Sequence, residues 1–108
     1  MSSHFSNLLY YIPDLESRNI LDLGCGKGGF LIEATKRGTS VSGLEKNIAY
    51  INKALELAKN NNVEINVKQG VAEEMPYAKE SFDFVNMSEL IEHVEDPDKV
   101  LLEVYKIL

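Results

Sequence analysis

The chain has 108 residues, of which 44% are hydrophobic and 26% charged, a composition typical of one modest globular domain. Its formal net charge is −6, and residues 55–108 hold twelve acids against five bases, which argues against a nucleic-acid partner. No apolar run is long enough to span a membrane and the single cysteine excludes an internal disulfide, so we expect a cytoplasmic protein without a membrane partner.

The first half of the chain is predicted to alternate helices and strands. Residues 3–12 carry apolar side chains at helical spacing, so residues 1–18 are predicted to be an N-terminal helical segment. Residues 19–23 form an apolar run typical of a strand, and a glycine-rich turn then opens a helix that Gly38 ends. Residues 40–45 are predicted to form the second strand.

A further helix and two more strands are expected next. Asn47 is placed to cap a helix that runs to about Asn60, and the asparagines at 60–62 tolerate a left-handed stop. The apolar face of this helix is predicted to consist of Ile48, Ile51 and Leu55. Residues 63–70 alternate apolar and polar side chains, which predicts a third strand, and residues 82–87 suit a fourth.

The last predicted element is a helix that begins at Asp96 and Pro97. Its apolar stripe consists of Val100, Leu101, Val104 and Leu108. Strands separated by helix-length segments favour a parallel sheet with right-handed crossovers. The predicted fold class is therefore α/β, a Rossmann-like doubly wound parallel sheet with strand order 3-2-1-4.

The stretch "ILDLGCGKGGF" joins the first strand to the helix that follows it. Gly24, Gly26 and Gly29 fit the dinucleotide fingerprint G-x-G-x-x-G, which alone is a weak signal. In a doubly wound sheet this turn lies at the carboxyl ends of the strands, where ligands bind against the N–H groups that open the helix. Glu45 ends the second strand, where a carboxylate can accept hydrogen bonds from both hydroxyls of a ribose. A nicotinamide dinucleotide and other adenosine cofactors fit these residues equally well.

Asp22 distinguishes between these cofactors. It precedes the first glycine of the turn by two residues, where a dinucleotide-binding strand normally carries an apolar side chain. A carboxylate at this place is costly unless it meets a positive or hydrogen-donating group, and a pyrophosphate would repel it. S-adenosylmethionine instead has an ammonium, a ribose diol and no phosphate. The alternatives are that Asp22 caps a helix start or pairs with Lys27.

Four stretches in the expected order resemble the class I S-adenosylmethionine-dependent methyltransferases. They are "ILDLGCGKGG", Glu45 after the second strand, "GVAEEMPY", and "FDFVNMSELIEHVEDPDKVLLEV", and together they cover about residues 19–105. Such domains continue into further strands. The resemblance therefore implies that residues 1–108 are the N-terminal, S-adenosylmethionine-binding part of a methyltransferase domain, truncated before the later strands.

The resemblance also implies roles at the methionine end of the cofactor. Asp22, Gly24, Cys25 and Gly26 would hold this end, with Asp22 orienting the ammonium. Met87, at the end of the fourth strand, would offer its backbone carbonyl to the same ammonium. Cys25 is expected to be present for its small size and not as a nucleophile.

At the adenosine end, the resemblance assigns the ribose hydroxyls to Glu45 and a position beside the adenine to Lys46. Ala72 and Glu73 would frame the adenine, and Glu73 would accept a hydrogen bond from its exocyclic amine. The alternatives are that Glu73, like its neighbour Glu74, is solvated surface, and that Lys46 is an exposed lysine at a helix start.

An acidic segment follows the fourth strand. Glu89, Glu92 and His93 stand at i, i+3 and i+4, so one helical turn would place them on one face as half of a divalent-metal site. The segment also resembles methyltransferases of polyprenyl catechols and of small-RNA ribose ends, in which E-x-x-E-H binds a metal. The favoured interpretation is that no metal binds, that His93 packs under the sheet edge and that the glutamates are solvated. A general base for the acceptor is a further role for His93.

The expected function is methyl transfer from S-adenosylmethionine to an O, N or C atom of a small-molecule acceptor. One alternative is a catalytically incomplete module that binds S-adenosylmethionine, and another is an NAD-dependent oxidoreductase. Without later strands, the free edge of the fourth strand is expected to invite self-association.

Overall fold

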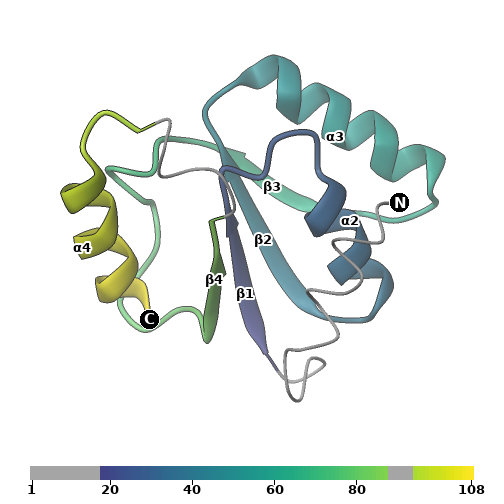
Figure 1. Ribbon diagram of the computed structural model, residues 1–108. Helices are drawn as coiled ribbons and strands as arrows, with labels where there is room; N and C mark the ends of the chain where they lie inside the picture. The colour runs from purple at the N-terminus through teal and green to yellow at the C-terminus, as the bar shows by residue number, and fades with distance from the viewer. Residues whose placement is uncertain (1–17, 88–93) are drawn as a thin grey trace.

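The computed structural model describes residues 18–87 and 94–108, so the predicted N-terminal helix lies outside the described residues. Four parallel strands form one sheet in the order β3-β2-β1-β4, which confirms the predicted fold class and strand order (Figure 1). The strands are β1 (Asn19–Leu23), β2 (Ser40–Glu45), β3 (Asn66–Gln69) and β4 (Phe84–Asn86).

The two outer strands are shorter than the sequence predicts. The third strand is formed by Asn66–Gln69 instead of residues 63–70, and the fourth by Phe84–Asn86 instead of residues 82–87. Among the described strands, β3 pairs only with β2 and β4 only with β1. In both outer strands the apolar pattern therefore extends beyond the residues that pair with the neighbouring strand.

Three helices are described: α2 (Gly29–Lys36), α3 (Ile48–Asn60) and α4 (Pro97–Ile107). Their ends agree with the predicted caps. The Asn47 side chain accepts hydrogen bonds from the first turn of α3, and the Asp96 side chain accepts one from Lys99 N–H at 3.1 Å. Gly38 has a φ of 79°, which suits the end of α2. No helix in these two ranges is long and apolar enough to cross a membrane.

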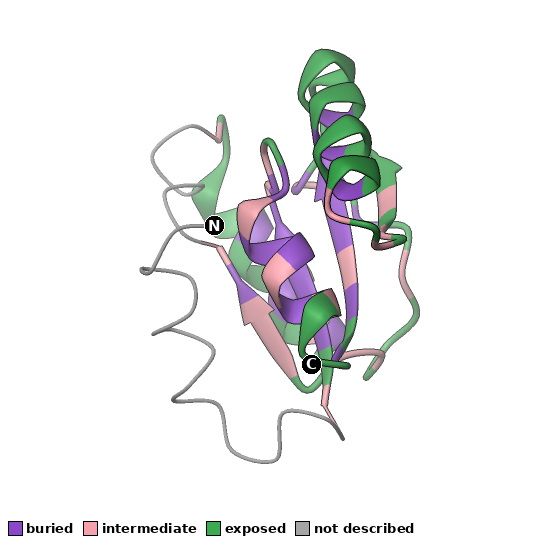
Figure 2. Ribbon diagram, turned by 90° about the vertical axis from the view of Figure 1, so that its right-hand side faces the viewer, coloured by how far each residue is buried: buried purple, intermediate pink, exposed green. Residues whose placement is uncertain are grey.

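The sheet carries a hydrophobic core on each face, because successive residues of β1 point to opposite sides. Ile20 packs with α2 on one face, whereas Leu21 and Leu23 pack with α4 on the other. In Figure 2, α2 is buried along most of its length and α3 exposes its outer side. The fold is thus doubly wound, and the carboxyl ends of its strands share one edge (Figure 1).

The predicted apolar faces of two helices need correction. In α3 the buried residues are Ile51, Ala54 and Ala58, whereas Ile48 and Leu55 are 53% and 45% exposed. In α4 the buried residues are Val100, Val104 and Ile107, whereas Leu101 and Leu108 are exposed. Small side chains of α3 face the glycine turn, since a Cβ on Gly28 would lie 2.9 Å from Ala54 Cβ. Close backbone approach therefore selects alanines for the packed side of this helix.

Candidate functional site

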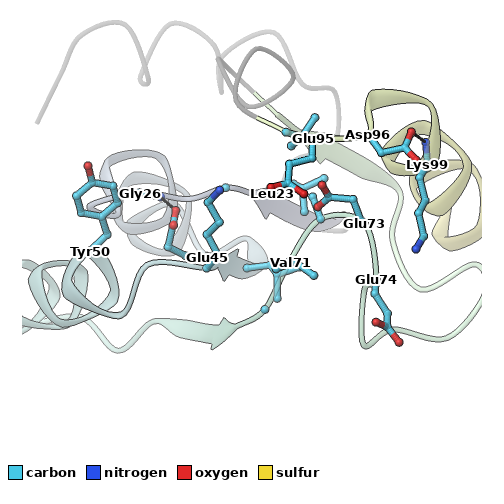
Figure 3. Close-up of a pocket in the computed structure, with 16 residues that line it drawn as sticks. Leu23, Gly26, Glu45, Tyr50, Val71, Glu73, Glu74, Glu95, Asp96 and Lys99 are labelled. Atoms are coloured by element: carbon cyan, nitrogen blue, oxygen red, sulfur yellow. Dashed lines mark hydrogen bonds between the residues drawn. The ribbon is translucent and has the colours of Figure 1, made fainter.

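A cleft of about 940 Å³ lies at the carboxyl ends of β1, β2 and β3 (Figure 3). Its floor is formed by the glycine turn and by Glu45, and the segment after β3 forms one wall. Residues 94–96 and Lys99, at the start of α4, form the opposite wall. The volume is at the upper end of the range for small-molecule sites, and the position is the one at which doubly wound sheets bind ligands.

In the glycine turn, every second residue from Gly24 to Gly28 has a backbone conformation in the left-handed region. The φ angles of Gly24, Gly26 and Gly28 are 71°, 57° and 90°. Gly24 N–H donates to the Leu44 carbonyl at 2.8 Å, which ties the turn to the end of β2. The third glycine that the backbone requires is therefore Gly28 and not Gly29, which is simply the first residue of α2. The adjacent glycines at 28 and 29 were the only sign of this in the sequence.

Glu45 is held in place by two backbone donors. Its Oε1 accepts from Gly26 N–H at 2.8 Å and its Oε2 accepts from Asn47 N–H at 2.9 Å. The side chain is buried, yet it lines the cleft. Each carboxylate oxygen has a second lone pair, so Glu45 can accept two further hydrogen bonds from a ligand while it orders the turn.

Asp22 lies buried in the middle of the sheet, 4% exposed, and does not line the cleft surface. Asn86 Nδ2 in β4 donates to its Oδ1 at 3.0 Å. Burial raises the pKa of the Asp22 carboxyl to about 7, the Asn86 hydrogen bond opposes this rise, and the charge of Glu45 adds to it. Neither alternative from the sequence is found in the described parts of the chain: Asp22 caps no helix, and Lys27 Nζ lies 5.9 Å from the Tyr50 ring centroid instead.

Cys25 packs into the core beneath the turn and does not line the cleft. Its Sγ would lie 3.0 Å from a Cβ added at Gly43, so there is little room for a larger side chain. Burial, together with the charges of Asp22 and Glu45, raises the pKa of the thiol to about 12. A thiol with this pKa is not a nucleophile at neutral pH. That the turn needs Cys25 for its small size stays a prediction.

Of the other residues that the sequence analysis singled out, the structure brings Lys46, Ala72 and Glu73 to the cleft together with Glu45. Ala72 is buried, Glu73 is half-buried and Lys46 is exposed. Glu73 points into the cleft, whereas the neighbouring Glu74 points away from its centre (Figure 3).

Met87 follows β4 and is half-buried against the core that contains Leu21 and Leu23. It does not line the cleft in the described structure. The candidates Glu89, Glu92 and His93 lie outside the described residues. Within the described residues, no group of three or more His, Cys, Asp or Glu side chains could hold a metal ion.

Several residues that line the cleft were missed by the sequence analysis. Tyr50 comes from the first turn of α3, Val71 follows β3, and Glu95, Asp96 and Lys99 come from the start of α4. The Asp-Pro pair indicated only where a helix begins. Nothing local in the sequence indicates that this helix start faces the glycine turn.

The cleft is acidic. Five carboxylates line it, from Glu45, Glu73, Glu74, Glu95 and Asp96, against two lysines. Like charges near one another raise the electrostatic cost of binding an anion in a confined site. The cleft therefore favours a neutral or cationic ligand over a pyrophosphate.

Comparison with known proteins also indicates a methyltransferase. Residues 21–108 match a protein family described as "Methyltransferase domain". A ubiquinone biosynthesis O-methyltransferase from Pseudomonas entomophila is 36% identical over an alignment of 99 residues, and the match covers 87% of this chain and 41% of that protein. A norajmaline N-methyltransferase from Rauvolfia serpentina is 32% identical over an alignment of 106 residues, and the match covers 95% of this chain and 36% of that protein.

A solved structure described as S-adenosylmethionine-dependent methyltransferases from Methanosarcina mazei superimposes with a TM-score of 0.82 at 28% identity. The match covers 94% of this chain and 51% of that one. The chain thus spans about two fifths of the curated relatives and half of this solved structure.

Proposed function

This chain belongs to the methyltransferase domain family, and we propose that it binds S-adenosylmethionine in the cleft at the carboxyl ends of β1, β2 and β3. We further propose that the protein transfers the methyl group to an O, N or C atom of a small-molecule acceptor. The observation that carries this proposal is the pair of buried carboxylates beside the glycine turn: Glu45 lines the acidic cleft, and Asp22 lies in β1 two residues before the turn.

Asp22 supports the placement of the methionine end. Its carboxyl has a raised pKa and is held by one hydrogen bond from Asn86, so a ligand ammonium nearby would favour its charged form. Gly24 and Gly26 leave the turn without side chains and let the ligand approach the backbone. Met87 supplies a backbone carbonyl at the end of β4 as a further acceptor for the same ammonium in this proposal.

Glu45 supports the placement of the ribose. Its two oxygens are fixed by Gly26 and Asn47, and their remaining lone pairs can accept from two adjacent hydroxyls. The adenine would then lie toward Ala72 and Glu73, where the half-buried Glu73 carboxylate can accept from the exocyclic amine. Lys46 would lie beside the same ring.

The sulfonium of bound S-adenosylmethionine supplies an activated methyl group, so the chain needs no nucleophile of its own. Its residues act by binding and orienting, which is sufficient to lower the barrier of an in-line displacement. Cys25, with a pKa of about 12 and a buried sulfur, takes no part in the proposed chemistry. A general base at His93 stays a prediction.

The class of acceptor is proposed only as a small molecule. The two relatives are named for methylation of an oxygen and of a nitrogen, so they do not agree on the acceptor atom. An NAD-dependent oxidoreductase is disfavoured by the five carboxylates of the cleft. Self-association through the edge of β4 stays a prediction, and a monomer in sedimentation would contradict it.

The test is calorimetric titration with S-adenosylhomocysteine, with NADH as the parallel ligand. We expect binding of the first alone, with Asp22→Asn and Glu45→Gln each weakening it by about tenfold or more, as for loss of a charge-assisted hydrogen bond. Glu56→Gln is the matched control, because it removes a carboxylate from the exposed side of α3. Binding of NADH in preference would refute the proposal.

A further inference from the structure

The connection from β3 to β4 carries the proposed adenine contacts and begins at the sheet. Gly70 N–H donates to the Glu45 carbonyl at 3.0 Å, which anchors the start of the connection to β2. A narrow turn follows, in which Val71 and Glu74 form an antiparallel bridge and Glu74 N–H donates to the Val71 carbonyl at 3.3 Å. Ala72 and Glu73 are the two residues at the tip of this turn.

A side chain of α4 holds the other end of the turn. Glu103 Oε1 accepts from Met75 N–H at 2.9 Å, while Glu103 Oε2 lies 2.9 Å from Lys106 Nζ. The Glu103 side chain is 19% exposed, and the Met75 hydrogen bond is the main cause that lowers the pKa of its carboxyl. Met75 is buried in the same core cluster as Ala72. Glu103 therefore anchors the end of the turn, through Met75, as the hydrogen bond of Gly70 anchors its start.

The later part of the connection is hydrogen-bonded to α4 through contacts that do not involve Glu103. Glu80 N–H donates to the Lys106 carbonyl and Phe82 N–H donates to the Ile107 carbonyl, both at 3.1 Å. These contacts use backbone acceptors near the end of α4 and lie five or more residues beyond Met75. Loss of the Glu103 side chain would thus release the turn and leave the connection itself attached.

Loss of this carboxylate would have a specific local effect. Met75 is buried, so its N–H would be left without an acceptor, and a buried unsatisfied donor is costly. The turn would relieve that cost by moving Met75 toward water or toward another acceptor. Such a movement would also displace Ala72 and Glu73, because Ala72 packs with Met75 in one core cluster and the turn that joins them is short.

We propose that Glu103 is a positioning residue for cofactor recognition, which acts from α4 through the Met75 N–H to hold Ala72 and Glu73 against the adenine. This inference rests on the proposed function, since it requires that adenine is bound at this turn. It makes α4 a structural part of the cofactor site at two places: its start lines the cleft, and Glu103 in its second turn sets the wall that would face the adenine.

The test compares Glu103→Ala and Glu103→Gln, with Lys106→Met as the control. The glutamine variant keeps an oxygen acceptor for Met75, and the lysine variant removes the ion pair but keeps the Met75 hydrogen bond. Affinity is measured by calorimetry for S-adenosylhomocysteine and for S-inosylhomocysteine, which lacks the exocyclic amine. Amide hydrogen exchange at Met75 reports the hydrogen bond directly.

We expect Glu103→Ala to lower the preference for S-adenosylhomocysteine over S-inosylhomocysteine by about tenfold, equivalent to about 1.4 kcal/mol. Met75 should exchange faster in this variant, whereas Glu103→Gln and Lys106→Met should keep both the preference and the slow exchange. Equal losses for both ligands would show a merely structural role and overturn the inference, as would a Glu103→Gln variant as poor as Glu103→Ala. A wild-type protein that binds neither ligand would refute the proposed function itself.

Discussion

The affinity for S-adenosylhomocysteine should depend on pH through Asp22. In the free protein, burial raises the pKa of this carboxyl from its ordinary value of 3.8 to about 7, so at pH 6 it is mostly protonated. The ligand ammonium would interact much more favourably with the ionised form, to which it makes a charge-assisted hydrogen bond. A proton therefore competes with the ligand, and the affinity should rise with pH and level off once Asp22 is ionised.

The magnitude follows from the pKa. With a value of about 7, roughly one tenth of the protein is ionised at pH 6 and roughly nine tenths at pH 8, so the dissociation constant should fall about tenfold between them. Binding at pH 6 should also release about one proton. Calorimetry in buffers of different ionisation enthalpy measures both the affinity and the released proton.

Asp22→Asn is the variant that tests this reasoning. It keeps a side chain of similar size near Asn86 but cannot titrate, so its affinity should be lower and nearly independent of pH. Any pH dependence that arises from other groups persists in the variant and can be subtracted. A wild-type affinity that is flat between pH 6 and pH 8, or a variant with the same slope as the wild type, would refute the assignment.

Three further predictions concern the elements that shape the cleft. Gly28→Ala should destabilise the fold by about 1–3 kcal/mol in denaturant unfolding, because its Cβ would lie 2.9 Å from Ala54 Cβ at a φ of 90°. Gly38→Ala, with a similar φ and open space, is the matched control and should cost less. Asn47→Ala should lower the free energy of unfolding by about 1 kcal/mol through loss of the α3 cap; no change would contradict the capping role. Cys25 should react with a thiol reagent only after unfolding, since its thiol is buried with a pKa of about 12, and fast labelling of the native protein would contradict this.

The centre of the fold could be predicted closely from the sequence. The observed bounds of β1 and β2 are those predicted, because both strands are paired on two sides and have apolar residues for both cores. The caps at Asn47 and Asp96 were also predicted, since capping depends on a side chain and the backbone two or three residues away.

Packing between distant elements could not be predicted in this way. Leu55 and Leu101 lie at helical spacing from buried residues, yet both side chains are about half exposed. Periodicity does not indicate how much of a helix surface the neighbouring element covers. The Glu103–Met75 contact joins residues twenty-eight positions apart, and no local pattern signals it. Glu45 was identified because its distance from the glycine turn is fixed by one strand–helix–strand unit.

Asp22 is the residue at which the requirements of the fold and of the proposed function disagree. It stands in a central strand between Leu21 and Leu23, where an apolar side chain would pack against the α2 core at less cost. The Asn86 hydrogen bond offsets part of that cost, but the raised pKa shows that the described surroundings still disfavour the charged form. A ligand cation would reverse this preference, so in the proposed function the unfavourable free carboxyl would contribute to selectivity for an ammonium. The same carboxyl, beside Glu45 and an acidic cleft, would repel a pyrophosphate, and so one buried side chain accounts for both what the site is proposed to accept and what it excludes.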